Sequence, residues 1–181
     1  MASGCTADAA PSEPTPTATA TKTATPTPTP TPSPTVDVTV PPARPEAMAT
    51  PSADGAAAAA SYLISLYPYV YATGDLTEWN SLSGPTCTFC SSTRDGAAEV
   101  HSEGRRIEGG AFTIESAEGI ELDAGRWYSA TIIGLESASV EYDSQGAVID
   151  ETPGGRHEVT IALSIAAGEW VVDGVEIRQA Q

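Results

Sequence analysis

Cys87 and Cys90, two of the three cysteines in the chain, are the residues whose type and spacing most readily suggest chemistry. They stand at C-x-x-C spacing in the segment GPTCTFCSST, which runs from Gly84 to Thr93. Two thiols at this spacing can form a redox-active dithiol, half of a metal site or a structural disulfide. Disulfides persist mainly outside the cytoplasm, so the choice depends on the compartment in which the protein folds.

A zinc site at these cysteines would need two further ligands. The chain has two histidines, His101 and His157, and neither stands at a spacing that completes a zinc pattern. Thioredoxin-like dithiols follow the first strand of an α/β sheet, and no strand is predicted before Cys87. We therefore expect a disulfide between Cys87 and Cys90 that holds the turn between two helices. Thiol–disulfide exchange outside the cytoplasm is the alternative.

The first five residues, MASGC, bear on the compartment. They lack the basic and apolar regions of a signal peptide. The small residues before Cys5 nevertheless resemble the lipobox of bacterial lipoproteins, in which the cysteine is acylated, although Ala2 stands where that pattern prefers leucine. We expect residues 1–5 to be the remnant of a lipoprotein signal and Cys5 to carry a lipid. The alternative is an incidental cysteine on a tail.

Residues 6–49 are rich in Thr, Pro and Ala, and most of the 15 prolines of the chain lie between Pro11 and Pro51. This stretch has no apolar periodicity and little charge, so it cannot bury enough surface to offset its chain entropy. The sequence predicts a disordered stalk here. Residues 50–181 are long enough for one domain with its own core, and too short for two.

The formal net charge of −16 lies almost wholly in the predicted domain. The arginines are scattered, and the single lysine, Lys22, belongs to the predicted stalk. Nucleic acid is excluded as a partner, because phosphate backbones are bound by basic stripes. The expected partners are the membrane, through a lipid on Cys5, and an envelope protein or a small ligand. Nothing in the sequence sets the oligomeric state.

Three helices are predicted in the first half of the domain. Ser52–Asp75 has apolar residues at spacings of three and four, after an N-cap at Thr50 with Pro51 in the first turn. Pro68 predicts a kink in this helix, and Gly74 predicts its end. Leu76–Leu82 reads as a short helix, and Cys87–Gly104 as a third. The predicted inward face of the first helix consists of Ala59, Tyr62, Leu63, Leu66, Tyr69 and Val70.

From Gly109 onward the period of the pattern changes from 3.6 to 2, which predicts strands. The clearest strand alternates Val159, Ile161 and Leu163 with more polar residues, which is typical of an antiparallel sheet with one buried face. The acids from Glu115 to Asp123 are expected to bracket a turn. Helices followed by strands indicate the α+β class. The predicted strands are Gly109–Ser116, Arg126–Leu135, Ser137–Asp143, His157–Ile165 and Glu169–Ile177.

A kinked helix, short helices and a closing GEWVVDGVEI resemble the NTF2-like cone, in which a curved antiparallel sheet wraps the first helix. More narrowly, TGDL, LSGPTCTFC and EGGAF resemble an uncharacterised family of actinobacterial lipoproteins with a Thr/Pro-rich tail and one such domain. The resemblance covers residues 44–181. It implies an extracytoplasmic, lipid-anchored protein of the cell envelope, and it brings no known activity.

NTF2-like enzymes place an acid or a His–Asp pair inside the cone. By that resemblance a pocket here could be lined by six residues, each of which is expected to belong to the core or its rim. We therefore assign no catalytic, cofactor-binding or metal-binding residue and no cofactor. Residues 141–152 faintly resemble a calcium-binding loop, and a hairpin turn explains them more simply. The six residues are Tyr62, Tyr69, Trp79, His101, Tyr128 and Asp173.

The sequence thus favours a non-catalytic binding or interaction module of the cell envelope. One alternative is an NTF2-like isomerase, dehydratase or hydrolase that acts on a small apolar molecule, which rests on fold analogy alone. The other is thiol–disulfide exchange through Cys87 and Cys90. Whether the interior of the cone is hollow, and which side chains point into it, separates the first two.

Overall fold

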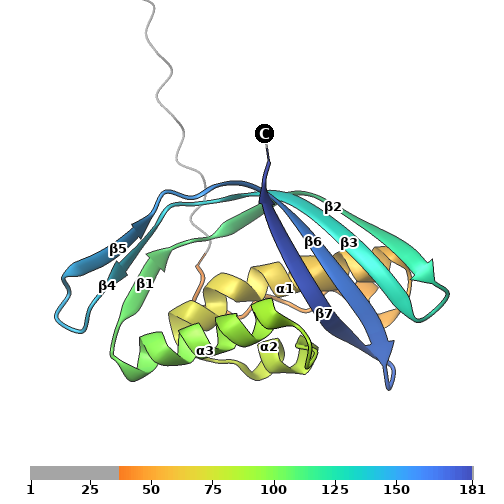
Figure 1. Ribbon diagram of the computed structural model, residues 1–181, viewed down its shortest axis with the longest axis horizontal. Coiled ribbons are helices and arrows are strands. Elements are labelled where there is room, and N and C mark those ends of the chain that lie inside the picture. Colours follow the sequence, from red (N-terminus) through yellow and green to blue (C-terminus); the bar gives the residue numbers. More distant parts are fainter. Residues whose placement is uncertain (1–36, 181) are drawn as a thin grey trace, which may run out of the picture. The chain divides into compact units, whose positions relative to one another are not determined.

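Two curved antiparallel sheets arch over three α-helices in the computed structural model, which describes residues 37–180 (Figure 1). The long first helix packs against strands of the larger sheet, as an NTF2-like cone requires. The predicted α+β class, with helices on a curved antiparallel sheet, is confirmed. The predicted lipobox at residues 1–5, the lipid on Cys5 and the stalk up to residue 36 lie outside the described residues.

Helix α1 (Ala53–Thr73) has its N-cap slightly later in the chain than the sequence predicts. The N-cap is Ser52, whose hydroxyl accepts a hydrogen bond from the Gly55 amide at 3.1 Å. The predicted N-cap at Thr50 is wrong, because Thr50 instead ends a short 3-10 helix, η1 (Glu46–Ala49). A serine side chain placed three residues before a free amide satisfies it without strain.

The inward face of α1 is the one that the spacing predicts, since all six of its predicted apolar residues are buried. Pro68 lies inside the helix. Gly74 ends the helix as predicted, with φ of 72°, a left-handed conformation that costs glycine little. None of the helices within residues 37–180 has the length and apolar character needed to cross a bilayer.

Residues 44–49, which the sequence assigns to the stalk, pack on the domain. Met48 is buried, and its carbonyl accepts a hydrogen bond from Trp170 Nε1 at 2.8 Å. The Arg44 guanidinium lies within 3.3 Å of the carboxylates of Glu78 and Glu169. The chain before α1 is therefore held both to α2 and to the start of the last strand.

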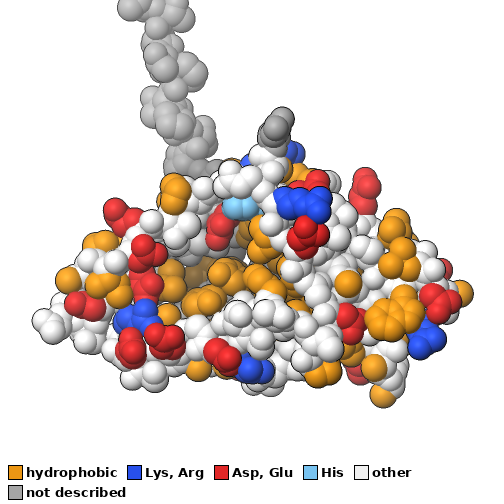
Figure 2. Space-filling view, in the orientation of Figure 1, with side chains coloured by type: hydrophobic (Ala, Val, Ile, Leu, Met, Phe, Trp, Pro, Cys, Tyr) orange, Lys and Arg blue, Asp and Glu red, His pale blue; other side chains and the backbone are white. Residues whose placement is uncertain are grey.

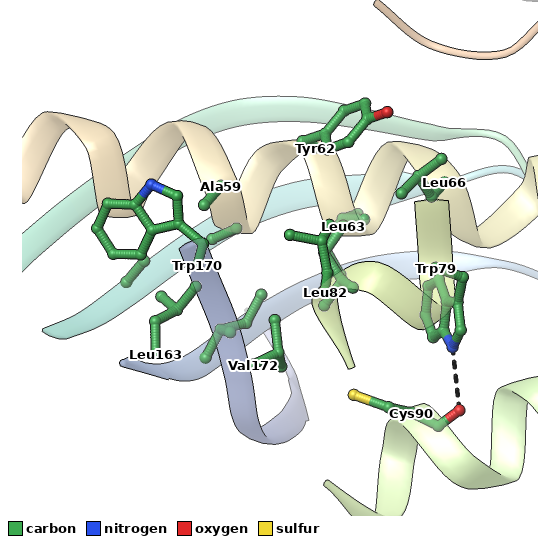
Figure 3. Close-up of a cluster of buried hydrophobic side chains, with 14 of the residues drawn as sticks. Ala59, Tyr62, Leu63, Leu66, Trp79, Leu82, Cys90, Leu163, Trp170 and Val172 are labelled. Carbon is green, nitrogen blue, oxygen red and sulfur yellow. Dashed lines mark hydrogen bonds between the residues drawn. The ribbon is translucent and has the colours of Figure 1, made fainter. Parts of the chain in front are cut away.

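Two further helices, α2 (Thr77–Leu82) and α3 (Thr88–Ser102), form where the sequence predicts them. Trp79 of α2 is buried, as expected, and so is Leu82. Figure 3 shows Trp79 between α1 and α3, with its indole Nε1 donating to the Cys90 carbonyl at 3.0 Å. This bond satisfies a buried indole N–H and ties α2 to the first turn of α3.

The strands form two sheets, and every pairing is antiparallel. The larger sheet has the order β2-β3-β6-β7, and the smaller has the order β1-β4-β5. In Figure 1 the two sheets form the two slopes of one arch over α1 and α3. The strands are β1 (Arg106–Gly109), β2 (Phe112–Asp123), β3 (Trp127–Glu136), β4 (Ser139–Tyr142), β5 (Val148–Thr152), β6 (Gly155–Ala166) and β7 (Glu169–Gln179).

Three details of the sheet differ from the prediction. Strands β1 and β5 were not predicted, because both are short and β5 is exposed along its whole length, which leaves no alternation to detect. Strand β2 continues to Asp123, so Glu118 and Glu121 lie within a strand and do not bracket a turn. β2 is an edge strand paired with β3 along its length, and exposed acids on an edge strand are well tolerated.

The core lies between α1 and the inner faces of β3, β6 and β7, and it includes α2. Among its largest fully buried side chains are Leu63, Trp79, Tyr128 and Leu163. The Tyr128 and Trp170 rings meet edge to face, with centroids 4.9 Å apart. We call the densely packed part of the domain around these residues the closed end of the cone.

Candidate ligand-binding site

The predicted disulfide is present, and Cys87 and Cys90 are joined at the start of α3. Cys87 is 2% exposed and Cys90 is 1% exposed. Cys87 Sγ also accepts a hydrogen bond from the Cys90 amide at 3.1 Å, as an N-cap of α3. Sulfurs enclosed in this way are inaccessible to an attacking thiolate, so the geometry favours a structural role at the α2–α3 turn over thiol exchange.

The segment that faintly resembles a calcium-binding loop is the hairpin between β4 and β5. Asp143 Oδ1 accepts hydrogen bonds from the amides of Gln145 at 2.8 Å and Ala147 at 2.9 Å. The carboxylate therefore serves the turn itself, as aspartate commonly does. Within residues 37–180, no group of three or more His, Cys, Asp or Glu side chains is placed to hold a metal ion.

The six residues proposed as pocket lining do not converge on one site. The hydroxyls of three tyrosines donate to separate carboxylates around the core: Tyr62 to Glu78, Tyr69 to Asp75 and Tyr128 to Glu121. Trp79 is enclosed in the core, as described above. The role expected of these residues, core or rim, is therefore the one that they have.

The two remaining members of the set lie elsewhere. His101 is exposed near the end of α3, with Nε2 3.0 Å from the Tyr71 carbonyl oxygen. Asp173 belongs to β7, and its Oδ2 is buried without a hydrogen-bond partner among the described residues. Neither lines the hollow described next.

The interior of the cone is hollow at its open end. A chamber of about 500 Å³ lies between α1 and α3 on one side and β1, β3, β4 and β5 on the other. Figure 2 shows this hollow, with hydrophobic side chains in its depth and acidic side chains along its edge. Its walls include Tyr67, Tyr71, Arg105, Glu136, Glu141 and Asp150.

A smaller recess of about 130 Å³ adjoins the chamber, and the two share Tyr67, Gly110 and Glu136 as walls. The recess is mostly apolar, and His157 and Glu136 are its charged or imidazole side chains. We call the chamber and the recess together the cone mouth. The apolar walls of the recess are Ile64, Phe89, Phe112, Val159 and Ile177.

His157 and Glu136 form a pair where chamber and recess meet. His157 Nε2 lies 3.2 Å from Glu136 Oε2, and the two side chains are 16% and 26% exposed. The other ring nitrogen, Nδ1, is buried and has no hydrogen-bond partner among the described residues. The pairing of β3 with β6 positions both residues, since His157 lies opposite Gly134 and Glu136 follows two residues later on the same inner face.

Two tyrosines from successive turns of α1 form the aromatic wall of the chamber. The Tyr67 and Tyr71 rings meet edge to face at 5.1 Å, and Tyr67 stacks on Phe89 at 5.8 Å. Burial raises the pKa of both hydroxyls above the usual value, so both remain protonated donors. Gly96 of α3 admits Tyr71, because a Cβ there would lie 2.7 Å from the Tyr71 hydroxyl oxygen.

Arg105 is the one arginine or lysine among the described residues that line the chamber, and it is already paired. Its guanidinium lies within 3.0 Å of carboxylate oxygens of Glu99, Glu103 and Glu141. This network joins the end of α3 to β4, which fixes the smaller sheet against the helices. Arg105 therefore holds the chamber wall and is not free to receive an anion.

The sequence did not single out Tyr67, Glu136 or His157 as site residues. A signal for His157 existed, because it stands two residues before Val159 in the same alternating pattern, which places it on the inner face of β6. Glu136 likewise follows the buried positions Ile132 and Gly134 on β3. A charged residue that continues a buried face marks the point where the core ends.

Solved structures with this arrangement are similar in fold, at low sequence identity. The intermembrane space region of chloroplast protein ARC6 matches with a TM-score of 0.50 at 12% identity, over 71% of this chain and 98% of that one. An uncharacterized protein with a cystatin-like fold from Caulobacter vibrioides matches with a TM-score of 0.45 at 12% identity, over 70% and 91%. The protein Aln2 from a Streptomyces species matches with a TM-score of 0.42 at 14% identity, over 66% and 87%. At such identities a likeness concerns the fold alone.

Sequence comparison yields a family without an assigned activity. The model of a family of unknown function, DUF6318, matches residues 16–176. No curated protein is significantly similar in sequence to this chain.

Proposed function

Because this chain belongs to the DUF6318 family, whose function is unknown, we propose a function from its own residues. In this proposal the protein is a non-catalytic binding module that holds a small, partly apolar ligand in the cone mouth. The observation that carries this proposal is the hollow itself. Protein interiors are normally packed as densely as organic crystals, whereas here a chamber of about 500 Å³ opens onto an apolar recess.

The size and lining of the cone mouth support this proposal. Ligand pockets typically measure about 300–1,000 Å³ and combine apolar walls with a few polar groups. Ile177 is 48% exposed although its strand position turns it toward the inside of the arch. Apolar surface of this kind gains about 25 cal/mol for each Å² that a ligand removes from water. A ligand with an apolar part therefore binds most favourably where it covers this exposed apolar surface.

Decanol tests the proposal, with binding to the full-length chain measured by isothermal titration calorimetry. In Ile177→Trp the indole fills the recess, so the affinity for decanol should fall at least tenfold. Leu135→Trp is the matched control: Leu135 is 50% exposed and lies on the outer face of β3. Its affinity should be that of the wild type. Equal loss in both variants contradicts the proposal, and so does absence of wild-type binding both by decanol and by ten-carbon ligands with a charged head.

We further propose that this module works outside the cytoplasm, anchored to an actinobacterial cell membrane or envelope through a lipid on Cys5, with the residues from 6 up to Arg44 supplying a spacer before the domain. The disulfide supports an oxidising compartment, and the small residues before Cys5 support the anchor. Mass spectrometry of the chain purified from its native membranes should find a diacylglycerol on Cys5. Cys5→Ser should move the chain out of the membrane fraction, and an unmodified Cys5 contradicts the anchor.

An enzyme is the second candidate, and the His157–Glu136 pair favours it. A carboxylate that orients one imidazole nitrogen leaves the other to accept a proton, and Nδ1 of His157 is without a partner among the described residues. Turnover of a small apolar epoxide or unsaturated ketone, lost in His157→Gln with decanol binding retained, supports catalysis. Binding of such compounds without turnover leaves the non-catalytic module standing.

A further inference from the structure

Acidic and aromatic side chains line the chamber together. Glu136 and Tyr67 are both walls of the chamber and of the recess, and Glu141 and Tyr71 are both walls of the chamber. Both tyrosines come from α1, and both acids come from the facing strands β3 and β4. The chamber therefore offers a carboxylate and an aromatic ring side by side.

The charges around the chamber do not cancel. Its charged walls among the described residues are four acids and one arginine, a formal charge of −4 + 1 = −3. Arg105 is held by Glu99 and Glu141, together with Glu103 outside the chamber. Of this charge, −2 belongs to Glu136 and Asp150, and the other −1 is left over from Glu99 and Glu141 after their pairing with Arg105. Glu136 has His157 as its one ion-pair partner among the described residues, and that partner is charged only when protonated.

The position of Glu136 connects this charge to the apolar recess. Glu136 and Tyr67 are walls of both the chamber and the recess. A ligand whose apolar chain fills the recess, against Phe112, Val159 and Ile177, therefore brings its next atoms to the Glu136 carboxylate and the Tyr67 ring. Carboxylates beside aromatic rings bind ammonium groups, by ion pairing and by the attraction of a cation to the face of the ring.

We propose that the ligand of the cone mouth is a cationic amphiphile, whose ammonium head binds between Glu136 and Tyr67 while its apolar chain occupies the recess. This inference rests on the proposed binding function and specifies the class of its ligand. An anionic head is disfavoured, because it would meet Glu136 and Asp150, and Arg105, the one arginine among the described residues of the chamber, is already paired. The net charge of −16 also attracts cations to the protein.

Three ligands with a ten-carbon chain and different heads test the inference: decyltrimethylammonium, decanol and decanoate. Each is titrated into the full-length chain by calorimetry, below the concentration at which it forms micelles. Decyltrimethylammonium should bind at least tenfold more tightly than decanol, and decanoate more weakly than decanol. Equal affinity for the ammonium and the alcohol, or tighter binding of decanoate, overturns the cationic class.

Variants identify the carboxylate that is responsible. Glu136→Gln keeps the shape and removes the charge, so the preference for the ammonium over decanol should disappear. Glu118→Gln is the control for net charge, since Glu118 is exposed on β2 and lies outside the cone mouth. It should keep the preference, and an equal loss in both variants overturns the inference by showing diffuse attraction to an acidic surface.

A second position keeps the test decisive if Glu136→Gln does not fold. Asp150→Asn changes an exposed residue of β5 and should weaken the ammonium about threefold with decanol unaffected. If Asp150→Asn left the preference for the ammonium over decanol unchanged, the acidic side chains of the chamber would not be the cause of that preference, which overturns the inference. The two proposals also fail differently, because decanol binding without an ammonium preference overturns the cationic class alone. Absence of binding by all three ligands overturns the binding function itself.

Discussion

The closed end and the cone mouth are built from the same helix and strands, but the closed end is densely packed and the cone mouth is hollow. At the closed end Leu63 of α1 and Leu163 of β6 are completely buried (Figure 3), and Tyr128 of β3 is nearly so. At the mouth, one turn further along α1, Tyr67 lines a hollow, and the inner face of β6 carries His157. The change from core to cavity thus occurs within single elements.

The inner face of β3 shows how this change is encoded. This face consists, in order, of Tyr128, Ala130, Ile132, Gly134 and Glu136. Its first three side chains are apolar or aromatic, the glycine has none, and the last is charged. At Gly134 a Cβ would lie 2.2 Å from the Phe112 ring, so glycine is what lets that ring pack there. Beyond Gly134 no apolar side chain remains on the inner face of β3, because Leu135 lies on the outer face and Glu136 is charged. A core that ends in a glycine and an ionisable residue leaves room for a ligand.

The largest effect expected from this comparison is on stability. Leu63→Ala should lower the free energy of unfolding by about 3 kcal/mol, because it leaves a cavity in a site that cannot collapse. Ile177→Ala at the mouth should cost less than about 1 kcal/mol, since that side chain is 48% exposed already. Urea denaturation followed by tryptophan fluorescence measures both. Similar costs would mean that the mouth is packed like the core.

The disulfide supplies the next effect, and it belongs to the closed end. Replacing Cys87 and Cys90 with alanine opens a very short loop, so the loss should be about 2 kcal/mol on the chain-entropy model. The folded variant should bind decanol as the wild type does, since neither cysteine lines the mouth. Urea denaturation and calorimetry test the two statements. Loss of binding in a folded variant would show that the two ends are coupled.

The smallest effect concerns alkaline pH. Burial, followed by the charge of Glu78, raises the pKa of Tyr62 to about 12, whereas a tyrosine in an unfolded chain titrates near about 10. Between about pH 10 and 12 the unfolded state loses this proton first, so stability falls as pH rises through that range. In Tyr62→Phe the fall should be shallower in urea denaturation from about pH 9 to 12. An equally steep fall would place the Tyr62 hydroxyl in water.

The sequence predicts the closed end much better than the mouth. The apolar periodicity of α1 identified its buried face, and the C-x-x-C spacing identified the bond between Cys87 and Cys90, because packing and cross-linking leave local patterns. The mouth depends on where β3 and β6 extend past the packed core, which is a property of the assembled fold. His157 and Glu136 come together only through strand register, over a distance in sequence that no local pattern spans.

The unpredicted strands have the same explanation. β1 and β5 are short, and both pair with β4 to form the smaller sheet that closes one side of the chamber. Gly109 and Gly110, with φ of 89° and 71°, turn the chain from β1 into β2. At Gly109 a Cβ would lie 2.1 Å from the Ala138 carbonyl oxygen, so this crossing needs glycine. The glycine pair was visible in the sequence, and the strand before it was not.

The central statement is that the cone mouth is a ligand site and the closed end is solid. The most direct test is to determine which residues the alkyl chain of a bound ligand contacts. Isotope-filtered nuclear Overhauser measurements on the full-length chain with decyltrimethylammonium report this. The account predicts contacts from the alkyl chain to the methyl groups of Ile64, Val159 and Ile177, and none to Leu63 or Leu163. Contacts confined to exposed methyl groups of the outer sheet face, such as those of Leu135, would contradict it.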